Sequence, residues 1–126
     1  MSSLIDTTII VDYLRNNPKA VDFIEQEILS NQVIFASVIS YAEIYAGIRP
    51  EEEEAISNFF SGIKIIGIGI KIAECAGKYL KNYGKSHGLE LADAFIGATA
   101  LITGSRLVTL NRKHFPMNDI NIHVPY

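Results

Sequence analysis

The chain has 126 residues, 48% of them hydrophobic and 20% charged, which is the composition of one ordinary globular domain and not of a disordered chain. Its single cysteine, Cys75, excludes an intramolecular disulfide, and no nearby histidine completes a catalytic thiol pair. The formal net charge of −3 argues against tight binding of nucleic acid through positive charge alone.

Nothing in the sequence indicates secretion or insertion into a membrane. The first residues lack the basic segment of a signal peptide, and the longest nearly apolar stretch, residues 91–102, is too short to span a bilayer. We therefore expect a cytoplasmic protein with no membrane contact.

The first half of the chain alternates short apolar runs with helical patterns. Residues 3–5 are typical of a buried strand, and residues 7–14 have apolar side chains at helical spacing. Asn17 followed by Pro18 predicts a helix start, and that helix ends near Asn31. Residues 33–36 form a second predicted strand, which leads into another helix.

The second half repeats the alternation. Pro50 opens a helix whose first turn is acidic, residues 63–66 form a third strand, and an amphipathic helix follows until Gly84 and Gly88 break it. The remaining expected elements are an almost wholly apolar helix over residues 91–102 that ends at Gly104, a strand over 106–110 and an edge strand over 120–124.

This order predicts an α/β fold with three layers. Strands that alternate with helices form a parallel sheet, and the helices cover both of its faces. We expect a single domain over residues 1–126, with four to five parallel strands in the centre. Ligands of such sheets bind at the carboxyl ends of the strands.

Four oxygen-bearing side chains fall at or near that edge. Asp6 directly follows the first strand, Glu43 lies in the helix after the second, Asp93 lies in the first turn of the apolar helix, and Asn111 follows the fourth strand. The fold therefore brings Asp6, Glu43 and Asp93 toward one candidate site.

Each acid also has a purely structural interpretation. Asp6 suits a helix N-cap, Asp93 suits an N-terminal cap of its helix, and Ser40 with Glu43 matches a capping box, although Ser37 is an alternative cap there. Asp93 is the hardest to dismiss, because a carboxylate in an apolar helix costs several kcal/mol unless it is paired or bound to a cation. No Lys or Arg lies within residues 89–102 to pair with it.

Clustered carboxylates favour a hard divalent cation. Oxygen ligands select Mg²⁺, with Mn²⁺ as an alternative, and such a cation orients a phosphate and lowers the pKa of a bound water. The sequence has no histidine and cysteine set with zinc spacing.

Four segments resemble the motifs of PIN-domain ribonucleases, in the order in which that family has them. They are Leu4–Leu14, Ser37–Gly47, Leu91–Ala100 and Leu107–Asn111. The length and the motif order are similar to those of VapC-type toxins of bacterial and archaeal toxin–antitoxin pairs, and the resemblance covers essentially the whole chain.

The resemblance implies a role for each matching position. Asp6 and Asp93 would be the main Mg²⁺ ligands, Glu43 a third acid acting directly or through water, and Thr7 a hydrogen-bonding group near the metal or the phosphate. It also implies a three-layer PIN-like fold, endoribonuclease activity on RNA, a homodimer, and a small antitoxin whose tail blocks the site.

The sequence departs from this family in one stretch. Many relatives have a fourth acid within the segment that corresponds to residues 111–114, where this chain has Asn111, so one firmly held metal is expected rather than two. Arg112 and Lys113 are candidates for phosphate contacts, and a solvated turn is an equal alternative. His114 could serve as a general acid, but a surface role is favoured.

Two other functions stay open at this stage. Asp6 could be the nucleophile of an aspartyl-phosphate phosphatase or phosphotransfer domain, although such enzymes usually have a second Asp where this chain has Thr8. Alternatively, all the acids could be caps on a non-catalytic module whose acidic surface binds a protein.

Overall fold

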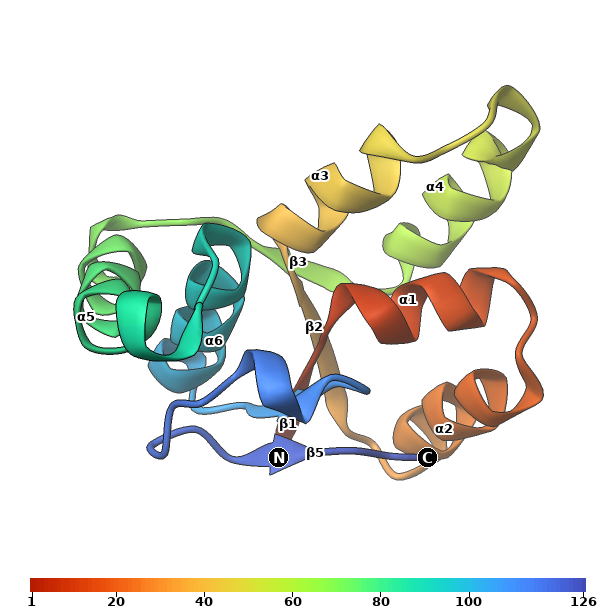
Figure 1. Ribbon diagram of the computed structural model, residues 1–126. Helices are drawn as coiled ribbons and strands as arrows, with labels where there is room; N and C mark the ends of the chain where they lie inside the picture. Colours follow the sequence, from red (N-terminus) through yellow and green to blue (C-terminus); the bar gives the residue numbers. More distant parts are fainter.

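The computed structural model describes residues Met1–Tyr126 and contains a five-stranded sheet flanked by helices on both sides (Figure 1). The strands are β1 (Ser2–Ile5), β2 (Val33–Ser37), β3 (Lys64–Ile66), β4 (Arg106–Val108) and β5 (Ile122–His123). The α-helices are α1 (Thr7–Leu14), α2 (Pro18–Leu29), α3 (Val38–Ala46), α4 (Glu53–Ser61), α5 (Ile70–His87) and α6 (Leu91–Thr103). Two short 3₁₀ helices are η1 (Pro50–Glu52) and η2 (Arg112–His114).

All neighbouring strands are parallel, in the order β3-β2-β1-β4-β5. The chain moves outward from β1 to β3 and then crosses back to place β4 on the other side of β1. The direction of winding therefore reverses between β1 and β4, and the crevice beyond their carboxyl ends is where such sheets bind ligands. The expected α/β fold with a central parallel sheet is confirmed.

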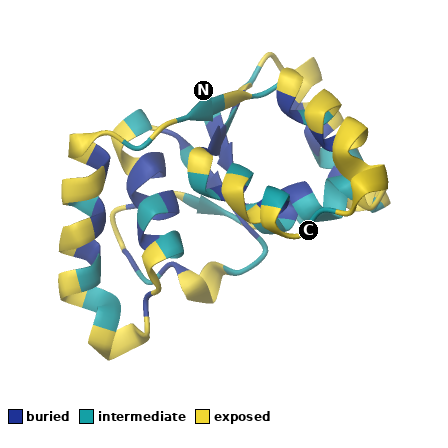
Figure 2. Cartoon of the chain, turned by 90° about the horizontal axis from the view of Figure 1, so that it is seen from above, coloured by how far each residue is buried: buried dark blue, intermediate teal, exposed yellow.

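The two helical layers follow from the alternation of side chains along the strands. Leu4 and Leu107 face the layer formed by α5 and α6, whereas Ile5 and Val108 face the layer that contains α1, α2 and α4. All four of these side chains are completely buried. Figure 2 shows the resulting pattern, with buried residues along the inner faces of the helices and exposed residues along the outer faces.

Local signals define most of the helix ends. Asn17 caps α2 by accepting a hydrogen bond from the Lys19 N–H, and Gly88 and Gly104 end α5 and α6 in the left-handed conformation that glycine tolerates best. The expected break at Gly84 is wrong, because α5 continues through it to His87. A glycine inside a helix costs only about 1 kcal/mol, which the packing of the α5 inner face outweighs.

None of the helices combines the length and the apolar character that crossing a membrane requires.

Candidate functional site

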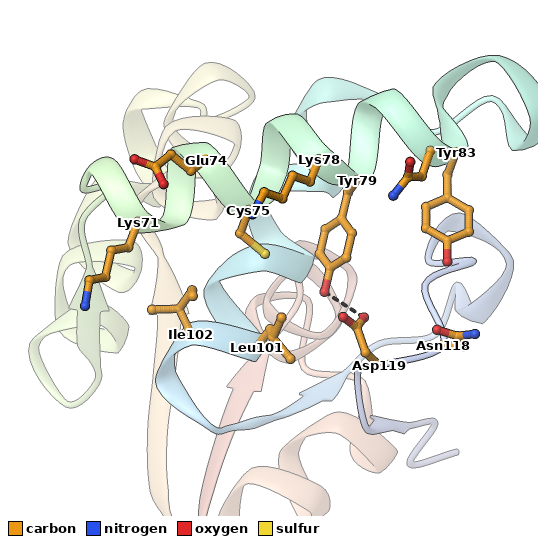
Figure 3. A pocket seen from close by; sticks show the side chains of 11 residues that line it. Lys71, Glu74, Cys75, Lys78, Tyr79, Tyr83, Leu101, Ile102, Asn118 and Asp119 are labelled. Carbon is orange, nitrogen blue, oxygen red and sulfur yellow. Dashed lines mark hydrogen bonds between the residues drawn. The ribbon is translucent and has the colours of Figure 1, made fainter.

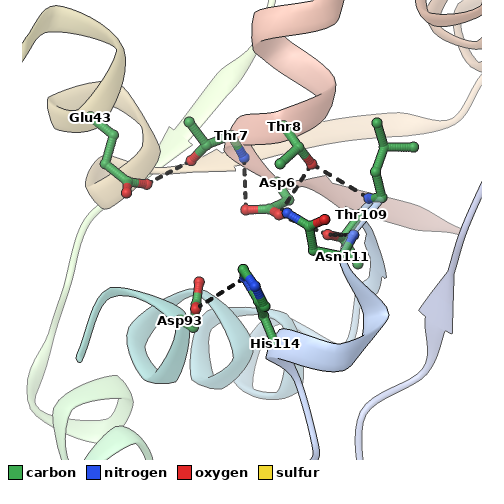
Figure 4. Close-up of polar contacts among 9 residues, drawn as sticks. Asp6, Thr7, Thr8, Glu43, Asp93, Thr109, Asn111 and His114 are labelled. Carbon is green, nitrogen blue, oxygen red and sulfur yellow. Dashed lines mark hydrogen bonds and ion pairs between the residues drawn. The ribbon is translucent and has the colours of Figure 1, made fainter. Parts of the chain in front are cut away.

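Asp6 lies between the end of β1 and the start of α1. This is the point where the winding of the sheet reverses between β1 and β4, and we call it the switch point. Its backbone N–H donates to the Val108 carbonyl at 2.8 Å, which extends the pairing of β1 with β4 by one residue. Its Oδ1 accepts from the Thr7 N–H at 2.8 Å, and its Oδ2 accepts from the hydroxyls of Thr109 at 2.7 Å and Thr8 at 3.3 Å (Figure 4). The N-cap interpretation of Asp6 is therefore confirmed, yet a carboxylate has about four lone-pair sites and these bonds occupy three. One site on Oδ1 remains for a ligand.

Asp93 is the third residue of α6 and does not cap it. Neither its carboxylate nor that of Glu90, at the N-cap position, forms a capping hydrogen bond, so the cap interpretation of Asp93 is wrong. Burial raises the pKa of the Asp93 carboxyl from 3.8 to about 6, and the negative charge of Asp6 contributes to the rise. The only ionic partner is His114, whose Nδ1 lies 3.6 Å from Asp93 Oδ2 and whose positive charge, when protonated, opposes the shift.

Glu43 lies on α3 and is turned toward Thr7. Its Oε1 is 2.7 Å from the Thr7 hydroxyl, which also lies 2.9 Å from the buried Ser40 hydroxyl. Because Thr7 has one hydroxyl proton, it donates to one of these two oxygens at a time, and the charged Glu43 carboxylate is the stronger acceptor. The capping box is wrong for this helix, because Ser37 is the N-cap and accepts from the Ile39 N–H. Glu43 is thus linked to the site by hydrogen bonding and not used in a cap.

The segment after β4 forms the remaining wall. The Asn111 N–H donates to the Thr109 hydroxyl at 3.0 Å, and η2 follows directly. Arg112 donates from Nη2 to the Ile122 carbonyl at 3.1 Å, which ties η2 to β5. The Lys113 side chain is exposed and forms no hydrogen bond or ion pair. His114, from the end of η2, points toward Asp93 (Figure 4).

The sheet edge therefore brings Asp6, Asp93 and Glu43 around one space without bringing them into direct contact. In this arrangement no three acidic, histidine or cysteine side chains are close enough together to hold a metal ion. The donor chemistry nevertheless fits Mg²⁺ or Mn²⁺, since the acids supply only oxygen atoms and none of them is paired with Lys or Arg. Asp93 in particular is a half-buried carboxylate with a charge penalty that a cation would relieve.

Sequence reasoning missed two hydroxyl groups and placed too little weight on one histidine. Thr109 and Ser40 are completely buried and hydrogen-bond to groups of the site, and His114 faces Asp93. Thr109 could have been found, because it follows the last residue of β4 just as Asp6 follows the last residue of β1. The pairing of His114 with Asp93 depends on the course of the chain after β4, for which the sequence has no strong signal.

A cavity of about 580 Å³ lies away from the acids, between α5, α6 and the segment around Asp119 (Figure 3). In it the Tyr79 hydroxyl donates to Asp119 at 2.8 Å. Cys75 also lines this cavity, and burial raises the pKa of its thiol, which keeps it in the poorly nucleophilic neutral form. This cavity contains none of the candidate site residues.

This arrangement, a parallel sheet with helices on both faces and acids at its switch point, agrees with a match to a known family. The chain belongs to the PIN domain family, whose model matches residues 3–119. It is similar to "Ribonuclease VapC19" of Mycobacterium tuberculosis, with 38% identity over 115 residues that cover 90% of this chain and 92% of the relative. It is also similar to "Ribonuclease VapC1" of Methanocaldococcus jannaschii, with 30% identity over 89% of this chain and 77% of the relative.

Solved structures support the same fold. The VapBC2 structure from Rickettsia felis, bound to a promoter DNA fragment, superposes with a TM-score of 0.85 at 22% identity and covers 98% of each chain. VapBC-1 from nontypeable Haemophilus influenzae superposes with a TM-score of 0.80 at 26% identity, over 98% of this chain and 97% of that one. The predicted resemblance to PIN-domain and VapC-type proteins is confirmed.

Proposed function

We propose that this chain is a metal-dependent endoribonuclease that acts as the toxin of a toxin–antitoxin pair. The observation that carries the proposal is the pair Asp6 and Asp93, which face one space at the switch point and have no Lys or Arg partner. Burial and the nearby charge of Asp6 raise the pKa of Asp93, so ionising this carboxyl costs free energy that folding alone would not favour. Two relatives of the chain are named as ribonucleases, and this supports the proposed activity.

In the proposed reaction, Asp6 and Asp93 hold Mg²⁺, or Mn²⁺ in its place, and Glu43 acts directly or through water. Bound there, the cation would offset the charge of a phosphodiester and lower the pKa of an attacking water. The hydroxyls of Thr109 and Thr8 keep the Asp6 carboxylate in one orientation. Thr7 joins Glu43 to the start of α1, so that the third acid stays close to the reacting phosphate.

The other two candidate functions have less support. As a phosphatase nucleophile, Asp6 would have to attack with a carboxylate that accepts three hydrogen bonds, and each bond lowers its nucleophilicity. A module whose acids all act as caps disagrees with Asp93 and Glu43, neither of which caps a helix.

The toxin role carries two further proposals, a small antitoxin and a homodimer. Beside the acids, a groove of about 160 Å³ includes Thr7 and Glu43 together with apolar side chains of α1 and α4, so a segment seated in it would cover the site. Several structural neighbours are toxin–antitoxin complexes. Light scattering measures the mass of the purified chain, alone and with the product of a neighbouring small gene. A monomeric mass of the chain alone would contradict the homodimer, and a mass that the added product leaves unchanged would contradict the antitoxin.

The central experiment measures cleavage of single-stranded RNA with Mg²⁺ or with EDTA. We expect wild type to cut internally only with the metal, and Asp6→Asn and Asp93→Asn each to lower the rate by at least about a hundredfold, because each removes a charged ligand. Asp22→Asn, on the exposed face of α2, is the matched control and keeps the wild-type rate. Wild-type rates in both site variants would rule out this site, and undiminished cleavage in EDTA would rule out the metal.

A further inference from the structure

Another cavity lies directly beside the acidic site, between the ends of β4 and β5. It measures about 500 Å³ and is lined by Leu110, Asn111, Arg112, Lys113, His114 and Val124. His114 belongs to both places, since it lines this cavity and faces Asp93 at 3.6 Å. Whatever occupies the cavity is therefore next to the groups that would perform the reaction.

The charge of this cavity differs from that of the chain. The protein has a net charge of −3, yet no Asp or Glu lines this space, whereas Arg112, Lys113 and His114 all do. Four other cavities of the chain each include at least one carboxylate. Lys113 is free of ion pairs, and Arg112 uses one N–H on the Ile122 carbonyl while its guanidinium has five. Positive charge without a protein partner attracts phosphate.

The rest of the lining suits a nucleobase. Leu110 and Val124 present apolar surface, and Val124 is 39% exposed. The Asn111 amide forms no hydrogen bond, although its backbone N–H does, so it offers one donor group and one acceptor to a base edge. Apolar contact with the base face and hydrogen bonds to its edge are how proteins hold unpaired bases.

We propose that this cavity holds one unpaired nucleotide of a single-stranded RNA, next to the phosphodiester at Asp6 and Asp93. Its base lies against Leu110 and Val124, and Asn111 reads the base edge. Lys113 and the free N–H groups of Arg112 contact the adjoining phosphate. The inference rests on the proposed ribonuclease function and adds to it a requirement for an unpaired base and a sequence preference at one position.

The first test measures binding without cleavage. In the Asp6→Asn background, a fluorescent single-stranded oligoribonucleotide is titrated at several salt concentrations, and its anisotropy gives Kd. Lys113→Glu is expected to weaken binding at least tenfold at about 50 mM salt and to lower the salt slope by about one or more. Lys85→Glu makes the same charge change on the exposed face of α5 and is expected to stay within about twofold. Equal effects of the two variants on Kd would overturn the proposal that RNA binds in this cavity.

The second test measures base preference with a pool of oligoribonucleotides randomised around the cleavage point. Asn111→Ala and Val124→Ser are expected to change the preference at one neighbouring position, with thermal melting as the check that both variants fold. Preferences identical to wild type in both variants would overturn the assignment. If wild type cleaves no RNA at all, the proposed function fails, and the binding test still decides whether the cavity holds a nucleotide.

Discussion

At the scale of single residues, Asp93 shows most clearly a conflict between stability and its proposed role as a metal ligand. Its pKa is raised from 3.8 to about 6 by burial and by the charge of Asp6. A raised folded-state pKa means that the protonated form is favoured in the fold. The contribution of Asp93 to stability is therefore fully present below pH 3.8 and is lost as the pH rises through about 6.

Asp93→Asn is expected to stabilise the metal-free protein by about 1–2 kcal/mol at pH 8, because the amide carries no charge to bury. The gain shrinks as the pH falls from 6 toward 4, where wild type is itself protonated. Urea unfolding of both proteins across this range measures the difference, with Asp22→Asn as a control whose effect stays flat. A variant that is less stable than wild type at pH 8 would contradict the account.

Thr109 makes the shortest of the three hydrogen bonds that orient the Asp6 carboxylate. It is completely buried, donates to Asp6 Oδ2 at 2.7 Å and accepts from the Asn111 N–H at 3.0 Å. Thr109→Val keeps the shape and removes both bonds, so we expect a loss of about 1–3 kcal/mol in stability and a clear fall in kcat for RNA cleavage.

Thr99→Val is the matched control for that substitution. Thr99 is also completely buried, but its hydroxyl donates only to the Phe95 carbonyl within α6. Thr99→Val is expected to change the free energy of unfolding without changing kcat. Equal losses of kcat in the two variants, measured well below their melting temperatures, would show that Thr109 has no positioning role.

At the scale of elements, α6 packs closely against the segment that follows η2, and this packing holds η2 and its His114 beside Asp93. The contact passes over Gly97: a Cβ there would lie 2.5 Å from Met117 Cε and 3.0 Å from Ile120 Cδ1. Both atoms are ends of flexible side chains, so the fold can adjust at a cost. Gly97→Ala is expected to destabilise the protein by about 1–3 kcal/mol.

Gly77→Ala, in α5, is the paired measurement. Gly77 is exposed and a Cβ there meets nothing within 4 Å, so alanine should stabilise α5 by up to about 1 kcal/mol. Thermal unfolding of the two variants should therefore shift in opposite directions. A gain in stability for Gly97→Ala would mean that the two segments do not pack as described.

At the scale of the whole molecule, the sheet has an amino edge, where its strands begin, and a carboxyl edge, where they end, and the two differ in their polar groups. The amino edge holds a partly buried ion pair in which Arg106 Nη2 lies 2.6 Å from Glu27 Oε1, and the buried Ser3 hydroxyl donates to the same oxygen at 2.7 Å. These groups tie α2 to β1 and β4. The acids of the proposed reaction lie at the carboxyl edge, where no Lys or Arg neutralises them.

Glu27→Gln is expected to destabilise the protein by about 1–3 kcal/mol, because Arg106 is left without its counter-charge in a mostly buried place. Cleavage of RNA at a temperature where the variant is folded should keep its wild-type kcat, since the change lies at the opposite edge. Chemical denaturation and single-turnover kinetics measure the two effects. A strong loss of kcat in a fully folded variant would contradict this division between the edges.

The sequence by itself determined the class of fold and the candidate acids. Apolar runs of strand length between helical patterns predict a parallel sheet, and the caps at Asp6 and Asn17 are local signals that depend on neighbouring residues alone. The position of Asp6 at the end of a strand, and the lack of a nearby cation in α6, also follow from the printed order of residues.

Only the tertiary structure decided how these groups meet. Asp6 and Thr109 are 103 positions apart, and Thr7 and Glu43 are 36 apart, so their hydrogen bonds exist only because β1 lies between β2 and β4. The same strand order sets Asp93 near Asp6, turns His114 toward Asp93 and opens the cavity beside them. Such contacts depend on the strand order and on the path of the loops after it, which are set by the packing of the whole chain and not by any local pattern.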